Sequence, residues 1–236
     1  MRLLALDTAT ELCSAALWLD GSVMAHEAIR ERGHGELILP MIDELLREAE
    51  LDLRQLDAIA FGRGPGAFTG VRLAASVAQG LAFAVGLPLL PISDLRALAA
   101  QALLLPGAPP RALICQDARM GEIYWGCFER IGEAIHPVGP EVVAAPATVV
   151  LPSAWAAGRI CGAGSGFAAY AALLQAACGT LSAVFPDLRP RAREIARLAA
   201  QDGLASALPA ERGQPVYLRD DVAQPPAPSP PRTSPN

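Results

Sequence analysis

Gly62-Arg63-Gly64-Pro65-Gly66-Ala67-Phe68-Thr69-Gly70-Val71-Arg72 is the stretch of sequence that decides the fold. An apolar run at residues 58–61 precedes it, and a long segment rich in Ala, Leu and Val follows it at about 71–85. This order predicts a strand, a glycine-rich turn and the start of a helix. The glycines allow positive φ angles and close approach of another segment, and Thr69 is placed to cap the helix.

A phosphate-binding loop is one interpretation of this stretch. A Walker loop needs a lysine after its second glycine, and this chain has no lysine, so all 19 basic side chains are arginines. Pro65 and Phe68 also interrupt the dinucleotide-binding pattern. Two interpretations stay open: a tight strand-to-helix connection, or weak anion or nucleotide binding at the start of the helix. The residues for the second role are Asp7, Thr8, Gly64, Gly66, Thr69 and Gly70.

The composition indicates a folded protein with a large core. Its 236 residues are 52% hydrophobic, which is ample for burial. Its five cysteines show no C-x-x-C spacing, which predicts buried, reduced thiols in a cytosolic protein and no metal site. A net charge of -5 leaves no broad basic surface for nucleic acid. Any RNA would therefore be held largely by a partner.

Residues 73–93 carry no charge and would pass a hydropathy test for a membrane span. Two glycines and two prolines within this run favour instead a helix that ends near Val85, followed by a buried strand. The apolar run at the N-terminus is too short for a signal peptide and ends in Asp7. We therefore expect a cytoplasmic protein that makes no membrane contact.

The first half of the chain predicts three strands and then helices that alternate with strands. Strands are expected at 3–7, 12–19, 22–29, 58–61 and 87–92, and helices at 35–50, 71–85 and 94–104. Asp20-Gly21 is a two-residue hairpin turn between the second and third strands. This order is that of a ribonuclease H-like layered sheet.

A second, less regular copy of this order begins at Arg111, after a Pro- and Gly-rich segment. Strands are expected at 111–116, 122–130, 134–143 and 159–162, and helices at 167–178 and 190–201. The predicted fold class is therefore α/β, with tandem ribonuclease H-like domains. We expect an N-terminal domain at 1–105, a C-terminal domain at 106–220 and a disordered Pro-rich tail at 221–236.

The helix expected at 35–50 has an unusually wide apolar face. At about 100° per residue, its apolar side chains cover an arc of roughly 200°, where one buried face needs about half of that. Either a partner covers part of this arc, or another part of the chain does. The first interpretation predicts that Ile38, Met41, Ile42 and Leu45 are partly exposed in a monomer. Charging Met41 or Ile42 would then abolish pairing and leave the fold intact.

Five motifs carry a family resemblance. They are Leu6-Asp7-Thr8-Ala9-Thr10, His34-Gly35-Glu36-Leu37-Ile38-Leu39-Pro40, Gly64-Pro65-Gly66-Ala67-Phe68-Thr69-Gly70-Val71-Arg72, Asp117-Ala118-Arg119-Met120-Gly121-Glu122-Ile123-Tyr124-Trp125 and Pro215-Val216-Tyr217-Leu218-Arg219. Together they resemble the bacterial TsaB family over residues 1 to about 219. The glycine motif is shared with the paralogue TsaD, whereas the motif that begins at Asp117 is particular to TsaB. The resemblance implies the tandem fold of the acetate kinase, sugar kinase, Hsp70 and actin (ASKHA) superfamily.

The resemblance also implies a role in the threonylcarbamoyl modification of adenosine 37 in tRNAs that read codons starting with A. In that family TsaD transfers the group, the ATPase TsaE completes the assembly, and TsaB is the dimerisation subunit. We therefore expect a heterodimer with a TsaD-like paralogue, a homodimer when the protein is alone, and tRNA contact only through the complex. The partner interface is expected at His34, Glu36, Leu37, Ile38, Met41, Ile42 and Leu45.

The resemblance and the residues together predict no catalytic residue, no metal and no cofactor. TsaD holds its metal with two histidines four residues apart, and Asp94 and Leu98 stand at the matching positions here. Asp7 is either the relic of a metal-binding carboxylate or an acid that accepts backbone hydrogen bonds at a strand end. Asp117, Arg119 and Glu122 form either a local ion-pair network or a partner contact.

Two other functions are alternatives to that of a non-catalytic scaffold subunit. An ATP-dependent phosphotransferase of the same superfamily needs a nucleotide between the domains and a positioned acid, but the hairpin after Asp7 lacks the glycine that such kinases use. A peptidase needs a nucleophile elbow, a triad or metal ligands, and the sequence offers no recognisable set.

Overall fold

The computed structural model describes residues 1–155 and 158–219, so the predicted tail at 221–236 lies outside the described residues. The first sheet has five strands in the order β3-β2-β1-β4-β5. Their bounds are β1 Arg2–Asp7, β2 Leu12–Leu19, β3 Ser22–Ile29, β4 Ala58–Gly62 and β5 Leu89–Ile92. β2 is antiparallel to β1 and β3, whereas β4 is parallel to β1 and β5.

The second sheet repeats this topology. Its strands are β6 Arg111–Arg119, β7 Glu122–Ile131, β8 Ala134–Pro137, β9 Val142–Ala144, β10 Ile160–Ala163 and β11 Ala183–Phe185. The order is β11-β10-β6-β7-β8, with β9 paired to β7. Read from β6 as the first strand, both the order and the strand directions match those of the first sheet. The prediction of an α/β fold with two ribonuclease H-like sheets is confirmed.

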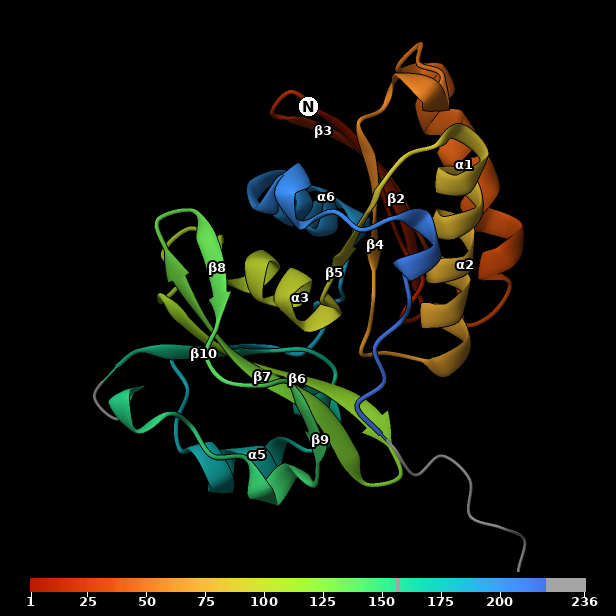
Figure 1. Cartoon of the computed structure of the whole chain (residues 1–236). Helices are drawn as coiled ribbons and strands as arrows, with labels where there is room; N and C mark the ends of the chain where they lie inside the picture. The colour runs from red at the N-terminus through yellow and green to blue at the C-terminus, as the bar shows by residue number, and fades with distance from the viewer. Residues whose placement is uncertain (156–157, 220–236) are drawn as a thin grey trace, which may run out of the picture.

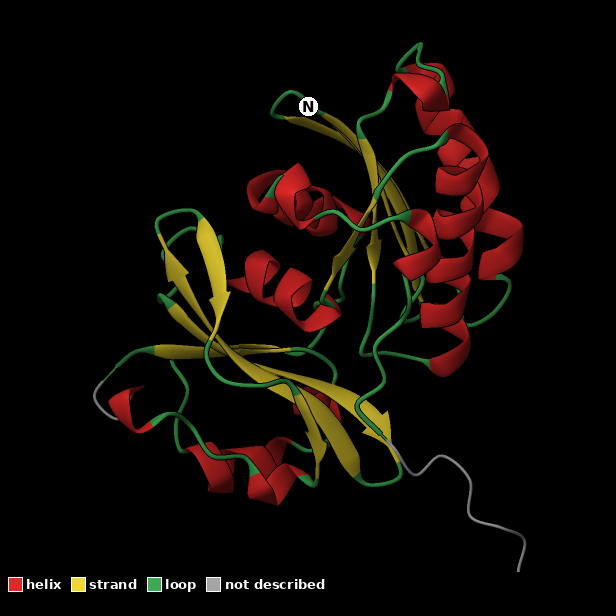
Figure 2. Ribbon diagram, viewed as in Figure 1, coloured by secondary structure: helices red, strands yellow, loops and turns green. Residues whose placement is uncertain are grey.

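Helices cover the outer face of each sheet and fill the space between the sheets (Figure 1; Figure 2). The α-helices are α1 His34–Glu48, α2 Phe68–Val85, α3 Asp94–Leu103, α4 Gly166–Ala169, α5 Ala171–Cys178 and α6 Ala192–Asp202. The 3-10 helices are η1 Leu53–Gln55, η2 Pro146–Thr148, η3 Ser153–Trp155, η4 Leu204–Ser206 and η5 Ala210–Arg212. α1 and α2 lie on the outer face of the first sheet, and α5 lies below the second (Figure 1).

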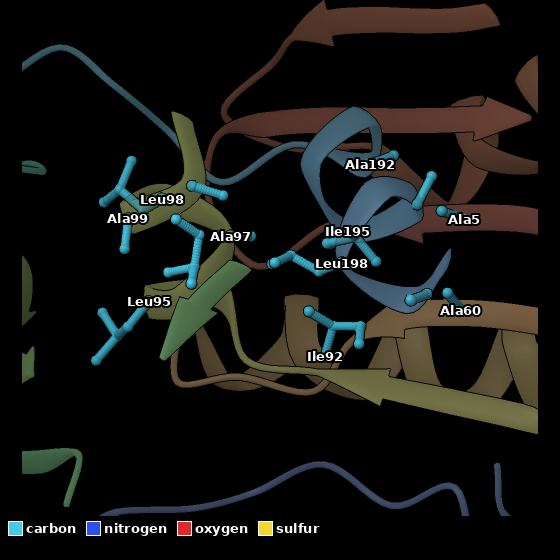
Figure 3. Close-up of a cluster of buried hydrophobic side chains, with 14 of the residues drawn as sticks. Ala5, Ala60, Ile92, Leu95, Ala97, Leu98, Ala99, Ala192, Ile195 and Leu198 are labelled. Carbon is cyan, nitrogen blue, oxygen red and sulfur yellow. The ribbon is translucent and has the colours of Figure 1, made fainter. Parts of the chain in front are cut away.

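The two inner helices are exchanged between the repeats. α3 follows the first sheet in sequence but packs on β6 of the second, whereas α6 follows the second sheet and packs on β1 and β2 of the first. Figure 3 shows Ile195 and Leu198 of α6 among Ala5, Ala60 and Ile92 of the first sheet. α3 is apolar almost all round, as expected of a helix buried on every side. One continuous core therefore joins the two sheets.

An ion pair between the inner helices gives a testable contribution to stability. Nη1 and Nη2 of Arg96 on α3 donate to the Asp202 carboxylate of α6 at 2.6 and 2.8 Å, and Nε donates to the carbonyl of Ile135 at 2.8 Å. We expect Arg96→Ala to lower the free energy of unfolding by about 2 kcal/mol, because charged, partly buried acceptors lose their donors. Urea denaturation followed by circular dichroism measures this change.

Arg54→Ala is the matched control, since its pair with Asp52 is at 3.7 Å and well exposed. We expect its effect to be about 0.5 kcal/mol or less. Equal losses in the two variants would show that the bond between α3 and α6 contributes nothing of its own.

α2 is long and apolar enough by length and composition to cross a membrane. In the structure, Ala74, Ala78 and Ala82 turn one face of α2 into the core of the first sheet. Gly86, in the left-handed conformation at φ 74°, ends the helix. The predicted helix followed by a strand is confirmed at this position.

Several sequence predictions differ from the structure in detail. Thr69 is not the cap of α2: the cap position is Ala67, and no side chain caps the helix. The strand expected at 134–143 is two strands, β8 and β9, because Pro140 has no amide to continue a ladder. The helix expected at 167–178 breaks at Tyr170 into α4 and α5.

Candidate functional site

The glycine loop packs directly on the turn after β1. A Cβ at Gly70 would overlap the carbonyl oxygen of Thr8, and one at Gly66 would lie 2.7 Å from the carbonyl oxygen of Ala9. Thr8 Oγ1 donates to the Gly70 carbonyl at 2.7 Å, and the Ala67 amide donates to the Ala9 carbonyl at 2.8 Å. These contacts are those of a tight strand-to-helix connection. Anion or nucleotide binding by this loop stays a prediction.

A C-terminal strap, defined as residues 213–219, fastens this loop from the other side. The Val216 amide donates to the Arg63 carbonyl at 2.7 Å, and a Cβ at Gly64 would lie 2.9 Å from the Val216 carbonyl oxygen. Further along the strap, the Tyr217 hydroxyl accepts a hydrogen bond from Arg72 Nε at 2.7 Å. The Arg72 guanidinium lies 3.6 Å from the ring centroid of Phe68. The strap thus packs against both the glycine loop and the start of α2.

The strap also reaches the hairpin between β6 and β7. Arg219 Nη2 donates to Glu122 Oε2 at 2.5 Å and to the Ala118 carbonyl at 3.2 Å. Arg119 pairs with Asp117 at 3.3 Å, whereas Glu122 pairs with Arg219, a partner that the sequence did not predict. Three separate sequence motifs, the glycine loop, this hairpin and the strap, therefore form one continuous structure.

Two fully buried carboxyl groups meet below the glycine loop. Asp7 Oδ1 accepts the Ala9 amide at 2.9 Å, so the expected backbone-binding role of Asp7 is present. Asp94 Oδ2 accepts the amide of Gly64. Burial raises the pKa of Asp7 to about 6. Burial and then the neighbouring charge of Asp7 raise the pKa of Asp94 well above its usual range. The sequence did not predict this pair, because its members are far apart along the chain.

A cleft of about 410 Å³ opens beside the loop, between the two sheets. Its polar side chains are already paired: Glu141 accepts from Ser93 Oγ and lies 3.6 Å from Arg63, while Arg96 is held by Asp202. Among residues 1–155 and 158–219, no three His, Cys, Asp or Glu side chains form a group that could hold a metal ion.

Less of the apolar arc of α1 is exposed than the sequence predicted. Ile38, Ile42 and Leu45 are 0%, 3% and 0% exposed, so the prediction of their partial exposure is wrong. Their spacing along the helix turns all three toward the first sheet. Charging Ile42 would therefore disturb the core rather than test pairing.

The expected interface residues outside this stripe are accessible to different degrees. Glu36 is exposed, whereas Leu37 and Met41 are half-buried. His34 is also half-buried, and its Nε2 bonds the Arg30 carbonyl at 2.8 Å, which fixes the first turn of α1. Their roles in partner binding stay predictions.

The apolar side chains beside that stripe lie on two flanks of α1. The β3 flank is marked by His26, which lies 3.3 Å from both Glu44 and Glu48, and it carries Leu37 and Met41. The α2 flank is marked by Gly35, whose Cβ would lie 4.0 Å from Leu73 of α2. At about 100° per residue, Leu39 and Leu46 lie on this second flank.

The second flank joins an apolar stripe of α2. We define the α1–α2 surface as Leu39, Leu46, Leu73, Val77 and Leu81. Leu39 is 49% exposed and the other four are half-buried. No atom of residues 1–155 or 158–219 lies within 4 Å of a Cβ placed at Gly80, so α2 also offers open backbone here. The sequence located α1 by its wide arc but did not include α2.

The two sheets of one strand order, with exchanged inner helices, define the tandem ribonuclease H-like class of the ASKHA superfamily. A family model described as TsaD, tRNA N6-adenosine threonylcarbamoyltransferase, matches residues 25–227. The chain is 40% identical to the tRNA threonylcarbamoyladenosine biosynthesis protein TsaB of Escherichia coli (strain K12), over 94% of this chain and 96% of that protein. The chain belongs to the TsaB family, and the resemblance seen in the sequence is confirmed.

Other relatives agree with this placement. TsaB of Haemophilus influenzae is 51% identical over 53% of this chain and 52% of that protein. YeaZ from Pseudomonas aeruginosa, a solved structure, is 42% identical with a TM-score of 0.85, over 92% of this chain and 99% of that chain. A second Pseudomonas aeruginosa structure, described as having similarity to peptidase YeaZ, has a TM-score of 0.86 at the same identity and coverage.

Proposed function

We propose that this protein takes part in tRNA threonylcarbamoyladenosine biosynthesis as a non-catalytic subunit that pairs with a TsaD-type transferase. Its TsaB relatives carry that pathway in their names. The observation that carries the pairing is the α1–α2 surface, an apolar strip on the outer face of the first sheet in which Leu39 is exposed and the other four side chains are half-buried. Contiguous apolar surface that solvent reaches in this way is typical of a protein interface.

The family model supports a TsaD-type protein as the partner. The TsaD model matches residues 25–227 and so spans both α1 and α2. A TsaD-type protein therefore has helices that correspond to these two, and two such pairs can pack about an approximate twofold axis. Two copies of this chain can pack in the same way when the transferase is absent. The proposal includes this homodimer.

The absence of a catalytic role is supported by how the polar groups are used. The carboxyl group at the end of β1 is fully buried and binds the chain's own backbone, out of reach of a substrate. The polar side chains of the cleft are engaged with one another. A net charge of -5 also favours tRNA binding through a partner. We place the complex in the cytoplasm, with a TsaE-like ATPase as its third protein.

Size-exclusion chromatography with light scattering tests the pairing. The protein is run alone and mixed with the TsaD-type protein of the same organism. We expect a homodimer alone and a heterodimer in the mixture. In parallel, formation of threonylcarbamoyladenosine on tRNA is measured with and without this protein, and we expect it to require the protein.

The alternative phosphotransferase would give a different result. The protein alone would turn over ATP, and Asp7→Ala would abolish that turnover. This outcome, together with no complex in the mixture, would overturn the proposed function.

A further inference from the structure

The buried carboxyl pair is not used by the proposed function. Asp7 is the last residue of β1 and Asp94 is the first residue of α3, and both are 0% exposed. Each binds one backbone amide with one of its oxygen atoms. The other two oxygen atoms, Asp7 Oδ2 and Asp94 Oδ1, are buried with no hydrogen-bond partner among the described residues. One orphan acceptor on each carboxyl group is an expensive arrangement unless a proton lies between them.

The two carboxyl groups meet at Gly62, the last residue of β4. A Cβ at Gly62 would overlap Asp94 Oδ1 and lie 2.7 Å from Asp7 Oδ1, so both carboxyl groups lie close to the Cα of Gly62. The amide of Gly64 donates to Asp94, and the amide of Ala9 donates to Asp7. Each carboxyl group is thus held beside Gly62 by one backbone amide.

We propose that Asp7 and Asp94 share one proton at neutral pH and form a pH-sensitive joint between β1, the glycine loop and α3. The proton comes from water, makes an O–H···O bond between the two orphan oxygens, and leaves the pair with a single negative charge. When it dissociates to solvent, two like charges face each other without water. Because α3 packs on the second sheet, this repulsion loosens the connection between the two sheets.

The surrounding charged and titratable groups do not supply a counter-charge that removes this effect. His34 of α1 lowers the pKa of Asp7, but its influence is smaller than that of burial. The Cys13 thiol of β2 has its own pKa raised to about 11 and stays neutral. Glu141 raises the pKa of Asp94 further, and Arg63 is 3.6 Å from Glu141. The net effect favours the protonated pair.

The sign of the pH dependence follows from these pKa values. In the unfolded chain both groups lose their protons near their ordinary pKa of 3.8. The native pair keeps a proton above that pH, so raising the pH favours unfolding. Each additional proton held by the native state raises the unfolding equilibrium constant about tenfold per pH unit. This rise begins near pH 4 and continues through the raised pKa of Asp7, at about 6.

Urea denaturation between pH 4 and pH 8 tests the proposal with wild type, Asp94→Asn and Asp7→Asn. An asparagine keeps the shape and replaces the shared proton by a permanent N–H donor. We expect the ratio of the wild-type to the variant unfolding constant to rise at least tenfold between pH 4 and pH 7. Asp187→Asn, at an exposed position, is the control and should give a ratio that does not change with pH. A constant ratio for both pair variants would overturn the proposal.

A second measurement keeps the proposal testable if neither variant folds. Carbon-13 NMR of the carboxyl groups in the wild-type protein follows each aspartate as it titrates. We expect one aspartate to titrate at about pH 6 or above. If all aspartate carboxyl groups titrate near their ordinary pKa, the shared proton does not exist.

Discussion

Leu39→Glu is expected to weaken binding of the TsaD-type partner strongly and leave the fold intact. Leu39 is 49% exposed on the α1–α2 surface, so the monomer can hydrate a glutamate there. In the complex, the same carboxylate would be buried without a partner. We expect a loss of about 2–4 kcal/mol in binding free energy, or roughly 30- to 1,000-fold in Kd. Isothermal titration calorimetry with the TsaD-type protein measures it, and thermal unfolding checks the fold.

Two other variants locate the interface. Val150→Glu changes a side chain that is 74% exposed near η2, away from the α1–α2 surface, and should leave Kd unchanged. Met41→Glu lies on the other flank of α1, beside β3, and should weaken binding less than Leu39→Glu. If Met41→Glu has the larger effect, the partner binds the β3 flank. Normal binding by both α1 variants would remove α1 from the interface.

Gly70→Ala is expected to be among the most destabilising single changes in the chain. The added Cβ would overlap the Thr8 carbonyl oxygen, which belongs to the backbone and has no rotamer to change. Either α2 or the turn after β1 must shift, and the hydrogen bond from Thr8 Oγ1 to the Gly70 carbonyl is strained. We expect a loss of about 3 kcal/mol or more in the free energy of unfolding. Urea denaturation measures this loss.

Gly80→Ala is the matched control, since both glycines lie in α2. Within the part of the chain that the structure describes, no atom lies within 4 Å of a Cβ at Gly80, so alanine adds helix propensity and meets no clash there. We expect a gain of about 0.5–1 kcal/mol. If both variants change stability in the same direction, the close packing of the glycine loop on Thr8 is not what fixes that loop.

The sequence by itself determined the order and type of most elements. Asp20-Gly21 set the β2–β3 hairpin, and the structure has φ angles of 48° and 106° at these positions. The glycine loop between an apolar strand and an apolar helix was equally plain, because turn chemistry and periodicity act between near neighbours. Short elements such as β11 were missed, since three residues carry no readable period.

Only the tertiary structure decided which surfaces face which. α3 and α6 are apolar or amphipathic in any fold, and their exchange between the sheets depends on how two sheets share one core. The wide apolar arc of α1 did not reveal that Ile38, Ile42 and Leu45 turn inward while Leu39 joins α2 outside. The contacts of Asp7 with Asp94 and of Arg219 with Glu122 also depend on the tertiary structure. Contacts between distant residues follow from the packing of whole layers, and local sequence patterns carry no record of that packing.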